Sequence, residues 1–379
     1  MYTSMMRKAM LGDTATLNLD FTTGVLDSRL TFTRSGTGTY INSSGYVTTA
    51  STNVARFEYD PATLAIRGLL IEGSATNLLN WSETFATTGG TNNNWADTNL
   101  TRTSTNNTSP RNDATALQIT ASAGNGTIIS SAAIGTSASR TLSVWLRRVT
   151  GTGNIQYTLD NGTNWTTQVI TSSWVRYSFA ATTAAQRVGF RIVTSGDAIE
   201  LWGAQLEAGS GASSYIVTVA SQVTRNADSC LMSGTNFSSW YTHGIGTVCW
   251  SGSVFRVTAG HLANINTVNN DPRITAYVGA GALTNLVTNP GTQVSMFFGS
   301  VTANTAFKAA WRFNTNDFAA CLNAGTVYTD TLGTVPTGVD RMQLGAAEGG
   351  YQFLDGWIKS IKYYPTAFTN AQLQTATTL

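Results

Sequence analysis

RTLSVWLRR, residues 140–148, is the stretch that decides the fold, because its side chains alternate between two kinds along the chain. In an extended chain, alternate side chains point to opposite sides. One side would carry the aliphatic residues Leu142, Val144 and Leu146. The other side would carry Ser143, Trp145 and Arg147. This two-residue period predicts a half-buried strand of an antiparallel sheet.

Segments of the same kind recur along the chain, separated by Gly, Asn, Ser and Thr. The strongest turn signal among them is Asp160-Asn161-Gly162, because Asn-Gly accepts the positive φ values of a tight hairpin turn. Short strands at regular spacing with turn residues between them are typical of a β-sandwich. The one helix we predict comes last, where Thr369 and Gln372 have the spacing of a capping box.

Length and composition favour several β domains over one. A chain of 379 residues exceeds the usual size of a single core. Charged residues make up only 11% of the chain, against roughly 25% in typical soluble proteins. We predict a β-rich N-terminal lead-in that includes the attachment segment (1–79), a first sandwich (80–224) and a second sandwich (225–379).

The charge pattern and the cysteines exclude several classes of protein. The net charge of +2 shows no basic cluster of the kind that binds nucleic acid. We find neither a secretory signal nor a run of 18 apolar residues, so we expect no Sec export and no membrane span. The three cysteines lack metal-type spacing. We expect buried thiols, with a Cys230–Cys249 disulfide left open as an alternative.

The sequence shows no catalytic constellation. Only His243 and His261 could act as a histidine base, and both fall where we expect turns or surface positions. A glycosidase, which needs two carboxylates, is the enzymatic alternative. Most aspartates fall at expected turns, and we interpret three glutamates as partners of arginines or backbone groups: Glu72, Glu200 and Glu207. We therefore predict no catalytic residue, no cofactor and no metal.

Glycan binding is the stronger functional hypothesis, because sandwich lectins stack exposed aromatic rings on sugars and add polar loop groups. Two loop-rich segments have this composition and supply the candidate residues Trp240, Tyr241, Asn270 and Asp271. The tryptophans that we place within strands are better explained by core or inter-subunit packing. They are Trp145, Trp174, Trp202, Trp311 and Trp357.

Residues 55–85, ARFEYDPATLAIRGLLIEGSATNLLNWSETF, resemble the segment that opens a sandwich module in many structural proteins of tailed bacteriophages. Residues 199–228, IELWGAQLEAGSGASSYIVTVASQVTRNAD, resemble the closing segment of the phage head spike fibre domain. Members of that family usually close on a Ser-Tyr-Ile-Pro-Thr-type sequence. This chain has Val217 where they have the proline.

The last third of the chain resembles the concanavalin A-like, or laminin-G-like, fold. Residues 307–325 are similar to its paired inner strands, and residues 351–377 to its closing strand and helix. Together the two resemblances imply an all-β protein with tandem antiparallel sandwiches, the first jelly-roll-like and the second concanavalin A-like, followed by one short C-terminal helix.

The phage resemblance implies a place on the virion surface, as a head spike, fibre or decoration protein made in the host cytoplasm. Its expected partners are other virion proteins, further copies of the chain in a homo-oligomer such as a trimer, and a cell-surface glycan. Few Lys or Pro residues protect the expected edge strands, which also favours assembly. A tail fibre adhesin and a polysaccharide-degrading enzyme are the alternatives.

Overall fold

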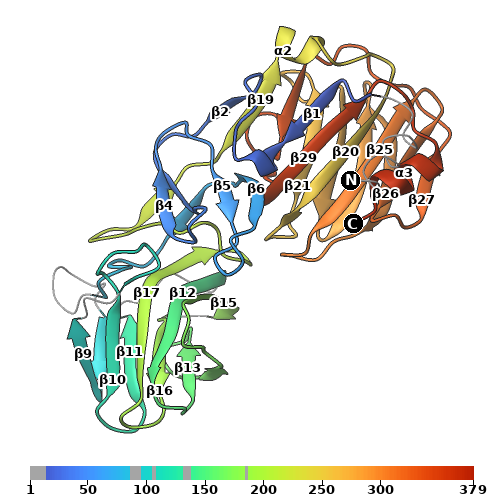
Figure 1. The fold of residues 1–379 in the computed structure, drawn as a ribbon. Helices are drawn as coiled ribbons and strands as arrows, with labels where there is room; N and C mark the ends of the chain where they lie inside the picture. The colour runs from blue at the N-terminus through green and yellow to red at the C-terminus, as the bar shows by residue number, and fades with distance from the viewer. Residues whose placement is uncertain (1–13, 86–94, 105–107, 131–137, 184–186) are drawn as a thin grey trace.

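The computed structural model describes residues 14–85, 95–104, 108–130, 138–183 and 187–379. Antiparallel strands form almost all of its regular structure and gather into two lobes (Figure 1). The predicted all-β fold of tandem sandwiches is therefore confirmed. Within the described ranges, no helix is both long and apolar enough to cross a membrane.

The first sandwich is the lobe drawn in green, and it consists of two five-stranded sheets. One sheet has the order β15 (Val175–Thr183), β12 (Ala138–Thr150), β17 (Ala198–Ala208), β10 (Leu117–Ala121) and β9 (Leu100–Ser104). The other has the order β14 (Thr166–Gln168), β13 (Ile155–Thr158), β16 (Gly189–Ile192), β11 (Gly126–Ser130) and β8 (Trp95–Thr98). Aliphatic and aromatic side chains from both sheets fill the core between them.

Strand β12 contains the stretch that predicted the fold, but both of its faces are buried. Its aliphatic face lies in the core of the first sandwich, as expected. On the other face, Trp145 is buried in a second cluster with Val47, Trp202 and Tyr215. The prediction of a half-buried strand is therefore wrong, because a hairpin from the lead-in and the closing segment cover its second face.

The predicted hairpin at Asp160-Asn161-Gly162 is confirmed. Asn161 has a φ of 62° and Gly162 a φ of 78°, and the turn joins the antiparallel pair β13 and β14. The chain supplies here the two residues that tolerate a left-handed backbone, so local sequence alone sets the turn.

The C-terminal sandwich consists of an eight-stranded and a seven-stranded sheet. The eight-stranded sheet has the order β27 (Val327–Asp330), β26 (Phe318–Leu322), β25 (Phe307–Asn314), β20 (Ile245–Val254), β29 (Gly356–Tyr364), β6 (Ile66–Ile71) and β5 (Phe57–Tyr59), and β1 (Leu17–Asp20) also pairs with β29. The seven-stranded sheet has the order β2 (Thr31–Thr33), β19 (Ser229–Ser233), β28 (Arg341–Leu344), β21 (Gly260–Asn266), β22 (Arg273–Gly279), β23 (Ala282–Thr288) and β24 (Thr292–Ser300).

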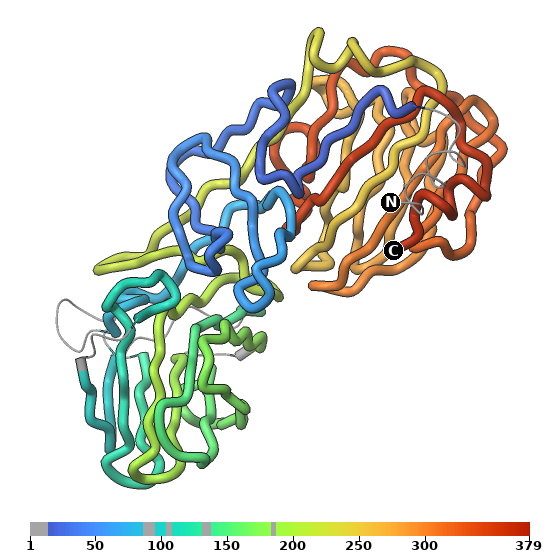
Figure 2. The backbone as a smooth tube through the Cα atoms, in the orientation of Figure 1, coloured from blue at the N-terminus to red at the C-terminus, as the bar shows by residue number. Residues whose placement is uncertain are grey.

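Four strands of the lead-in belong to the C-terminal sandwich, although the first sandwich separates them from it in the sequence (Figures 1 and 2). Strands β1 and β6 pair with β29, and β2 pairs with β19. Leu17, Leu19 and Leu69 are buried in the core of that sandwich. The domain boundaries at residues 79 and 224 stay predictions, and this pairing is a feature that they did not include.

Two small two-stranded sheets connect the lobes. One joins β3 (Gly38–Ile41) to β4 (Val47–Ala50), and the other joins β7 (Ala75–Asn77) to β18 (Val223–Arg225). Because β7 precedes the first sandwich and β18 follows it, the chain enters and leaves that lobe at one place.

Helices are short. Besides the single turns η1 (Phe21–Thr23) and α2 (Thr235–Ser238), the described residues form the helix α3 (Asn370–Ala376). Thr369 and Gln372 complete the predicted capping box of α3. The three cysteines are free thiols, so the alternative of a Cys230–Cys249 disulfide is not observed.

Candidate binding cleft between the two lobes

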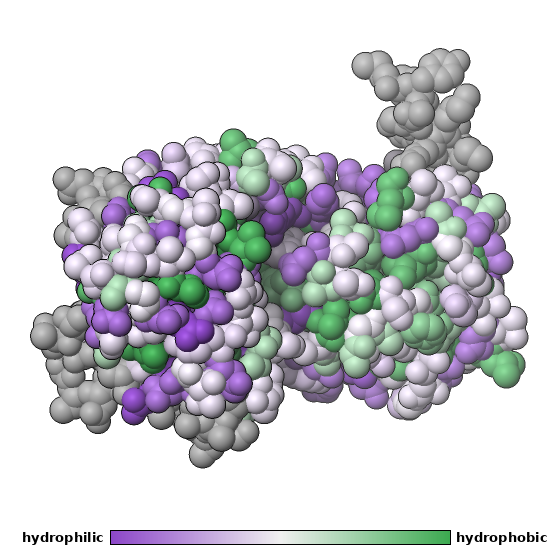
Figure 3. Space-filling view, turned by 90° about the horizontal axis from the view of Figure 1, so that it is seen from below, coloured by the Kyte–Doolittle hydropathy of each residue, from purple (hydrophilic) through white to green (hydrophobic). Residues whose placement is uncertain are grey.

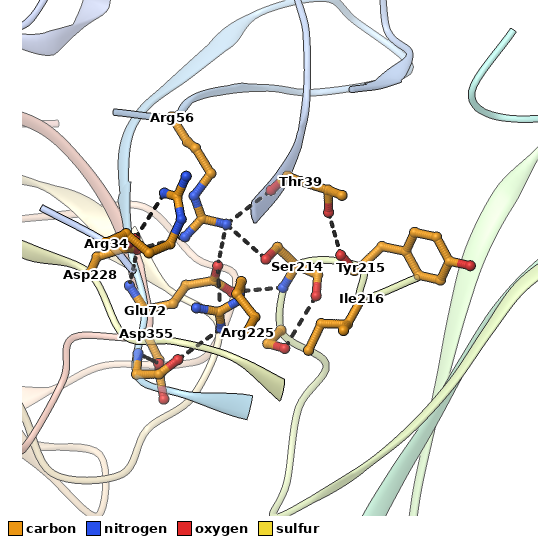
Figure 4. A network of polar contacts seen from close by, with 12 residues as sticks. Arg34, Thr39, Arg56, Glu72, Ser214, Tyr215, Ile216, Arg225, Asp228 and Asp355 are labelled. Atoms are coloured by element: carbon orange, nitrogen blue, oxygen red, sulfur yellow. Dashed lines mark hydrogen bonds and ion pairs between the residues drawn. The ribbon is translucent and has the colours of Figure 1, made fainter. Parts of the chain in front are cut away.

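A buried ionic network, which we call the joint, lies where the lobes meet (Figure 4). Its centre is Arg56, whose guanidinium lies 2.7 Å from Glu72 and 2.6 Å from Asp228, with all three side chains fully buried. Two further arginines, Arg34 and Arg225, reach the same carboxylates at 3.2 and 3.6 Å. Burial of one such charge without a partner would cost several kcal/mol, so the network holds these segments in one arrangement.

The joint connects segments that lie far apart in the sequence. Arg56 and Glu72 come from the lead-in, and Asp228 follows the first sandwich. Arg56 also donates hydrogen bonds to the carbonyl of Thr39 and to the hydroxyl of Ser214, and Ser214 N–H donates to Glu72. The two stretches that resemble phage proteins thus meet each other in the joint.

A conformationally demanding glycine helps to place this segment. Gly68 on β6 has a φ of 119°, and a β-carbon there would lie 2.2 Å from the carbonyl oxygen of Ile358 on β29. Only glycine fits both the backbone angle and this close approach. The register of β5, β6 and β29 therefore depends on it.

Beside the joint, a cleft of about 750 Å³ opens between the lobes. In the view from below, a hollow separates the lobes, and hydrophilic and hydrophobic residues both border it (Figure 3). Three parts of the chain form its walls: the lead-in with residues such as Tyr40 and Glu58, the first sandwich with Trp174, and the C-terminal sandwich with Phe255 and Trp357.

Aromatic rings and arginines stack in pairs around this cleft. The guanidinium of Arg67 lies 4.8 Å from the ring centre of Trp357, and that of Arg176 lies 4.6 Å from that of Trp145. Trp174, which is half-buried, is covered on one side by an arginine outside the cleft lining, Arg147. Such stacking fixes the rings and leaves their edges and free faces for a ligand.

The carboxyl groups that line the cleft differ in their charge. Burial by itself would raise the pKa of Glu72, but Arg225 and Arg56 outweigh it and lower that pKa to about 2. The hydrogen bond from Arg67 lowers the pKa of Asp60 to about 2. Glu58 is different: burial raises its pKa to about 7, against the opposing backbone N–H of Ile41.

Two of the four residues predicted to bind glycan are core residues. Trp240 and Tyr241 are only 3% and 7% exposed, and both belong to the main hydrophobic cluster of the C-terminal sandwich. They pack on Phe237 and Tyr363 with ring centres 4.8 to 5.5 Å apart. A sugar-stacking role needs an exposed ring face, which neither residue presents, so the expectation of an aromatic platform there is wrong.

The other two predicted residues lie on a different turn, between β21 and β22. Asn270 is buried, and its amide accepts a hydrogen bond from Asn264 and donates one to Tyr351. Asp271 is exposed and accepts a hydrogen bond from Thr288. Within the described residues, no hydrogen bond or ring contact connects this pair to Trp240 and Tyr241, so the structure does not bring the four together as one site.

The residues considered for catalysis have structural surroundings. His243 is exposed, as expected, but the prediction of a turn or surface position is wrong for His261. His261 lies buried on β21, where it bonds Thr275 and Gln352, and burial lowers its pKa to about 4. The predicted arginine pairing of the three glutamates is confirmed, with the partners Arg56 for Glu72, Arg147 for Glu200 and Arg256 for Glu207.

Of the tryptophans expected in the core, Trp145, Trp202, Trp311 and Trp357 are buried. Trp174 departs from this expectation, because it precedes β15 and remains half-buried at the cleft. Sequence reasoning missed Glu58 as well. The available signal was its position in a strand that alternates with aromatic residues, inside the stretch with the strongest family resemblance.

Comparisons with known proteins give structural likeness only. No family model and no curated protein matches the chain. Among solved structures, the CBM40 domain of the Ruminococcus gnavus IT-sialidase, bound to α2,3-sialyllactose, matches with 16% identity and a TM-score of 0.35, over 38% of this chain and 88% of that one. The binding domain of botulinum neurotoxin serotype D matches with 12% identity and a TM-score of 0.30, over 39% of each chain. The carbohydrate-binding module CBM29-2, complexed with cellohexaose, matches with 14% identity and a TM-score of 0.26, over 36% of this chain and 91% of that one.

Proposed function

We propose that this protein binds a saccharide in the cleft between its lobes and displays that cleft on the surface of a phage particle. The observation that carries the first part is the composition of the cleft. Half-buried aromatic rings, arginines and one unpaired carboxyl face a volume of about 750 Å³. This combination of apolar walls with a few fixed polar groups is typical of a small-ligand site.

The fixed position of the walls supports this proposal. The joint holds the lead-in against the segment that closes the first sandwich, with Arg56 fully buried between Glu72 and Asp228. A cleft whose walls are already in place loses little conformational entropy when a ligand binds. The same contacts make the cleft a property of the whole chain, not of one lobe.

We propose binding without catalysis, because glycoside hydrolysis commonly needs two carboxyl groups that are free to act. Asp60 is occupied: it accepts backbone N–H groups from Ala62 and Thr63, and it pairs with Arg67. Glu72 is fully buried in the joint. Among the described residues of the cleft lining, Glu58 remains as the single carboxyl without an ion pair.

The virion role rests on the resemblance of residues 55–85 and 199–228 to phage structural proteins. Those two stretches supply Arg56, Glu72, Ser214 and Asp228 to the joint, so the resemblance coincides with the contacts that shape the cleft. A homo-oligomer such as a trimer, and partners in the capsid or tail, belong to the same proposal. An antibody against the chain that fails to label purified particles would remove this part.

A glycan array tests the binding proposal, with two matched tryptophan variants. Trp174 and Trp165 are both half-buried, and each has an arginine over its ring, at 4.8 and 4.5 Å. Only Trp174 lines the cleft. We expect the wild-type chain to bind a saccharide class, Trp174→Ala to lose that binding, and Trp165→Ala to keep it. Equal loss in both variants, or no binding by the wild-type chain, would contradict the proposal.

The enzymatic alternative is tested separately. Incubation with a saccharide that the array identifies should release no reducing ends above the background of Glu58→Gln. Sustained release by the wild-type chain that Glu58→Gln abolishes would replace binding with hydrolysis as the function.

A further inference from the structure

Glu58 is the exception among the carboxyl groups of the cleft. Asp60 pairs with Arg67 and Glu72 pairs with Arg56, at 2.8 and 2.7 Å, but no ion pair of the described residues includes Glu58. One of its oxygens accepts the backbone N–H of Ile41 at 3.0 Å. Its side chain is half-buried and lines the cleft, so the remaining lone pairs are available to a ligand.

Charged groups act on Glu58 from each element around it. They fall into one further carboxylate, which opposes its ionisation, and arginines, which favour it. The carboxylate is Glu72 on β6, and the arginines are Arg67 on β6 and Arg56 before β5. Across the cleft, Arg176 on β15 also interacts with the charge of Glu58, and Asp60 lines the cleft after β5.

These arginines have other partners. Arg67 is engaged by Asp60, Arg56 by Glu72 and Asp228, and Arg176 donates to the carbonyl of Ser213. Their positive charge is therefore largely compensated before a ligand arrives. A ligand carboxylate would meet engaged arginines and the unpaired Glu58, whereas a ligand hydroxyl would meet an unsatisfied acceptor.

We propose that Glu58 determines the specificity of the cleft, accepting hydrogen bonds from the hydroxyl groups of neutral saccharides and disfavouring saccharides that carry a carboxylate. This inference rests on the proposed function. A hydrogen bond from a neutral donor to a carboxylate is about twice as strong as one between neutral groups. Two like charges held close together in a partly dehydrated cleft repel each other.

The proposal implies a pH dependence with a definite sign. Because burial raises the pKa of Glu58 to about 7, the side chain is mostly ionised at pH 8 and mostly protonated at pH 5.5. Lowering the pH removes the repulsion while the saccharide's own carboxylate stays charged. Affinity for acidic saccharides should therefore rise as the pH falls through 7, and affinity for neutral saccharides should fall or stay level.

The test measures binding of the full chain to oligosaccharides of neutral hexoses and to their uronic acid counterparts of equal length, at pH 8 and pH 5.5. At pH 8, Glu58→Gln should weaken binding of the neutral member by about tenfold, the value of one charge-assisted hydrogen bond. It should strengthen binding of the acidic member and remove the pH dependence. Glu348→Gln, at a carboxyl outside the cleft lining that pairs with Arg341, is the matched control and should change neither.

The outcomes separate this inference from the proposed function. If neutral saccharides bind and Glu58→Gln leaves the neutral-to-acidic ratio unchanged at both pH values, the inference is wrong and the proposed function stands. If the wild-type chain binds neither member, the proposed function fails and the inference fails with it. A thermal unfolding curve of each variant shows whether it is folded, and Glu58→Asp, which keeps the charge, should retain the wild-type preference.

Discussion

Replacement of Arg56 with methionine should destabilise the protein strongly, because it removes the centre of the joint. Arg56 forms ion pairs with Glu72 and Asp228 at 2.7 and 2.6 Å, with no side chain exposed. After the change, Glu72 would keep Arg225 at 3.6 Å and Asp228 would keep Arg34 at 3.2 Å. Loss of one partner from a buried ion pair costs about 3 to 5 kcal/mol, and we expect about 4 kcal/mol here.

The assay is urea-induced unfolding followed by tryptophan fluorescence. Arg29→Met is the matched control, because Arg29 also lies in the lead-in and pairs with Asp27 at 2.7 Å, but with side chains 30% and 25% exposed. An exposed pair contributes about 1 kcal/mol or less, so this control should change the free energy of unfolding little. If the two variants lose equal stability, or Arg56→Met loses less than about 1 kcal/mol, the joint does not hold the lobes as we describe.

Three other changes test separate parts of the structure. Glu58→Gln should be more stable than the wild-type chain at pH 8, by about 2 kcal/mol, and equally stable at pH 4: burial raises the folded-state pKa to about 7, so ionisation above that pH costs stability. An equal difference at both pH values in urea unfolding would contradict this. Thr369→Ala should cost about 1 kcal/mol through loss of the capping box with Gln372, and an unchanged urea midpoint would contradict it. Gly68→Ala should cost about 3 kcal/mol, since its β-carbon would meet Ile358; Gly36→Ala, with nothing within 4 Å of its β-carbon, should cost less.

Features fixed by neighbouring residues could be predicted from the sequence. The Asn161-Gly162 turn and the capping box of Thr369 and Gln372 each depend on residues a few positions apart. The alternation in residues 140–148 correctly placed β12 in a sandwich. It could not show that its second face would be covered, because the covering residues, such as Val47 and Tyr215, lie far away in the sequence.

The site was harder to predict for the same reason. Trp240 and Tyr241 stand among polar loop residues, which suggested exposure, yet Phe237 and Tyr363 draw them into the core. Glu58 has no local signal of a binding role. Its position at the cleft depends on β1 and β6 joining β29 near the end of the chain, a pairing between distant segments that no local pattern encodes.

Hydrogen exchange with and without the strongest-binding saccharide of the array is the most direct test of the cleft as the binding site. The account predicts slower exchange in amides from both lobes and the lead-in at once, within residues 39–41, 58–67, 173–178 and 211–215. Unchanged exchange in those segments, with slowing confined to residues 240–243 and 267–271, would place the site on the C-terminal sandwich alone and contradict the account.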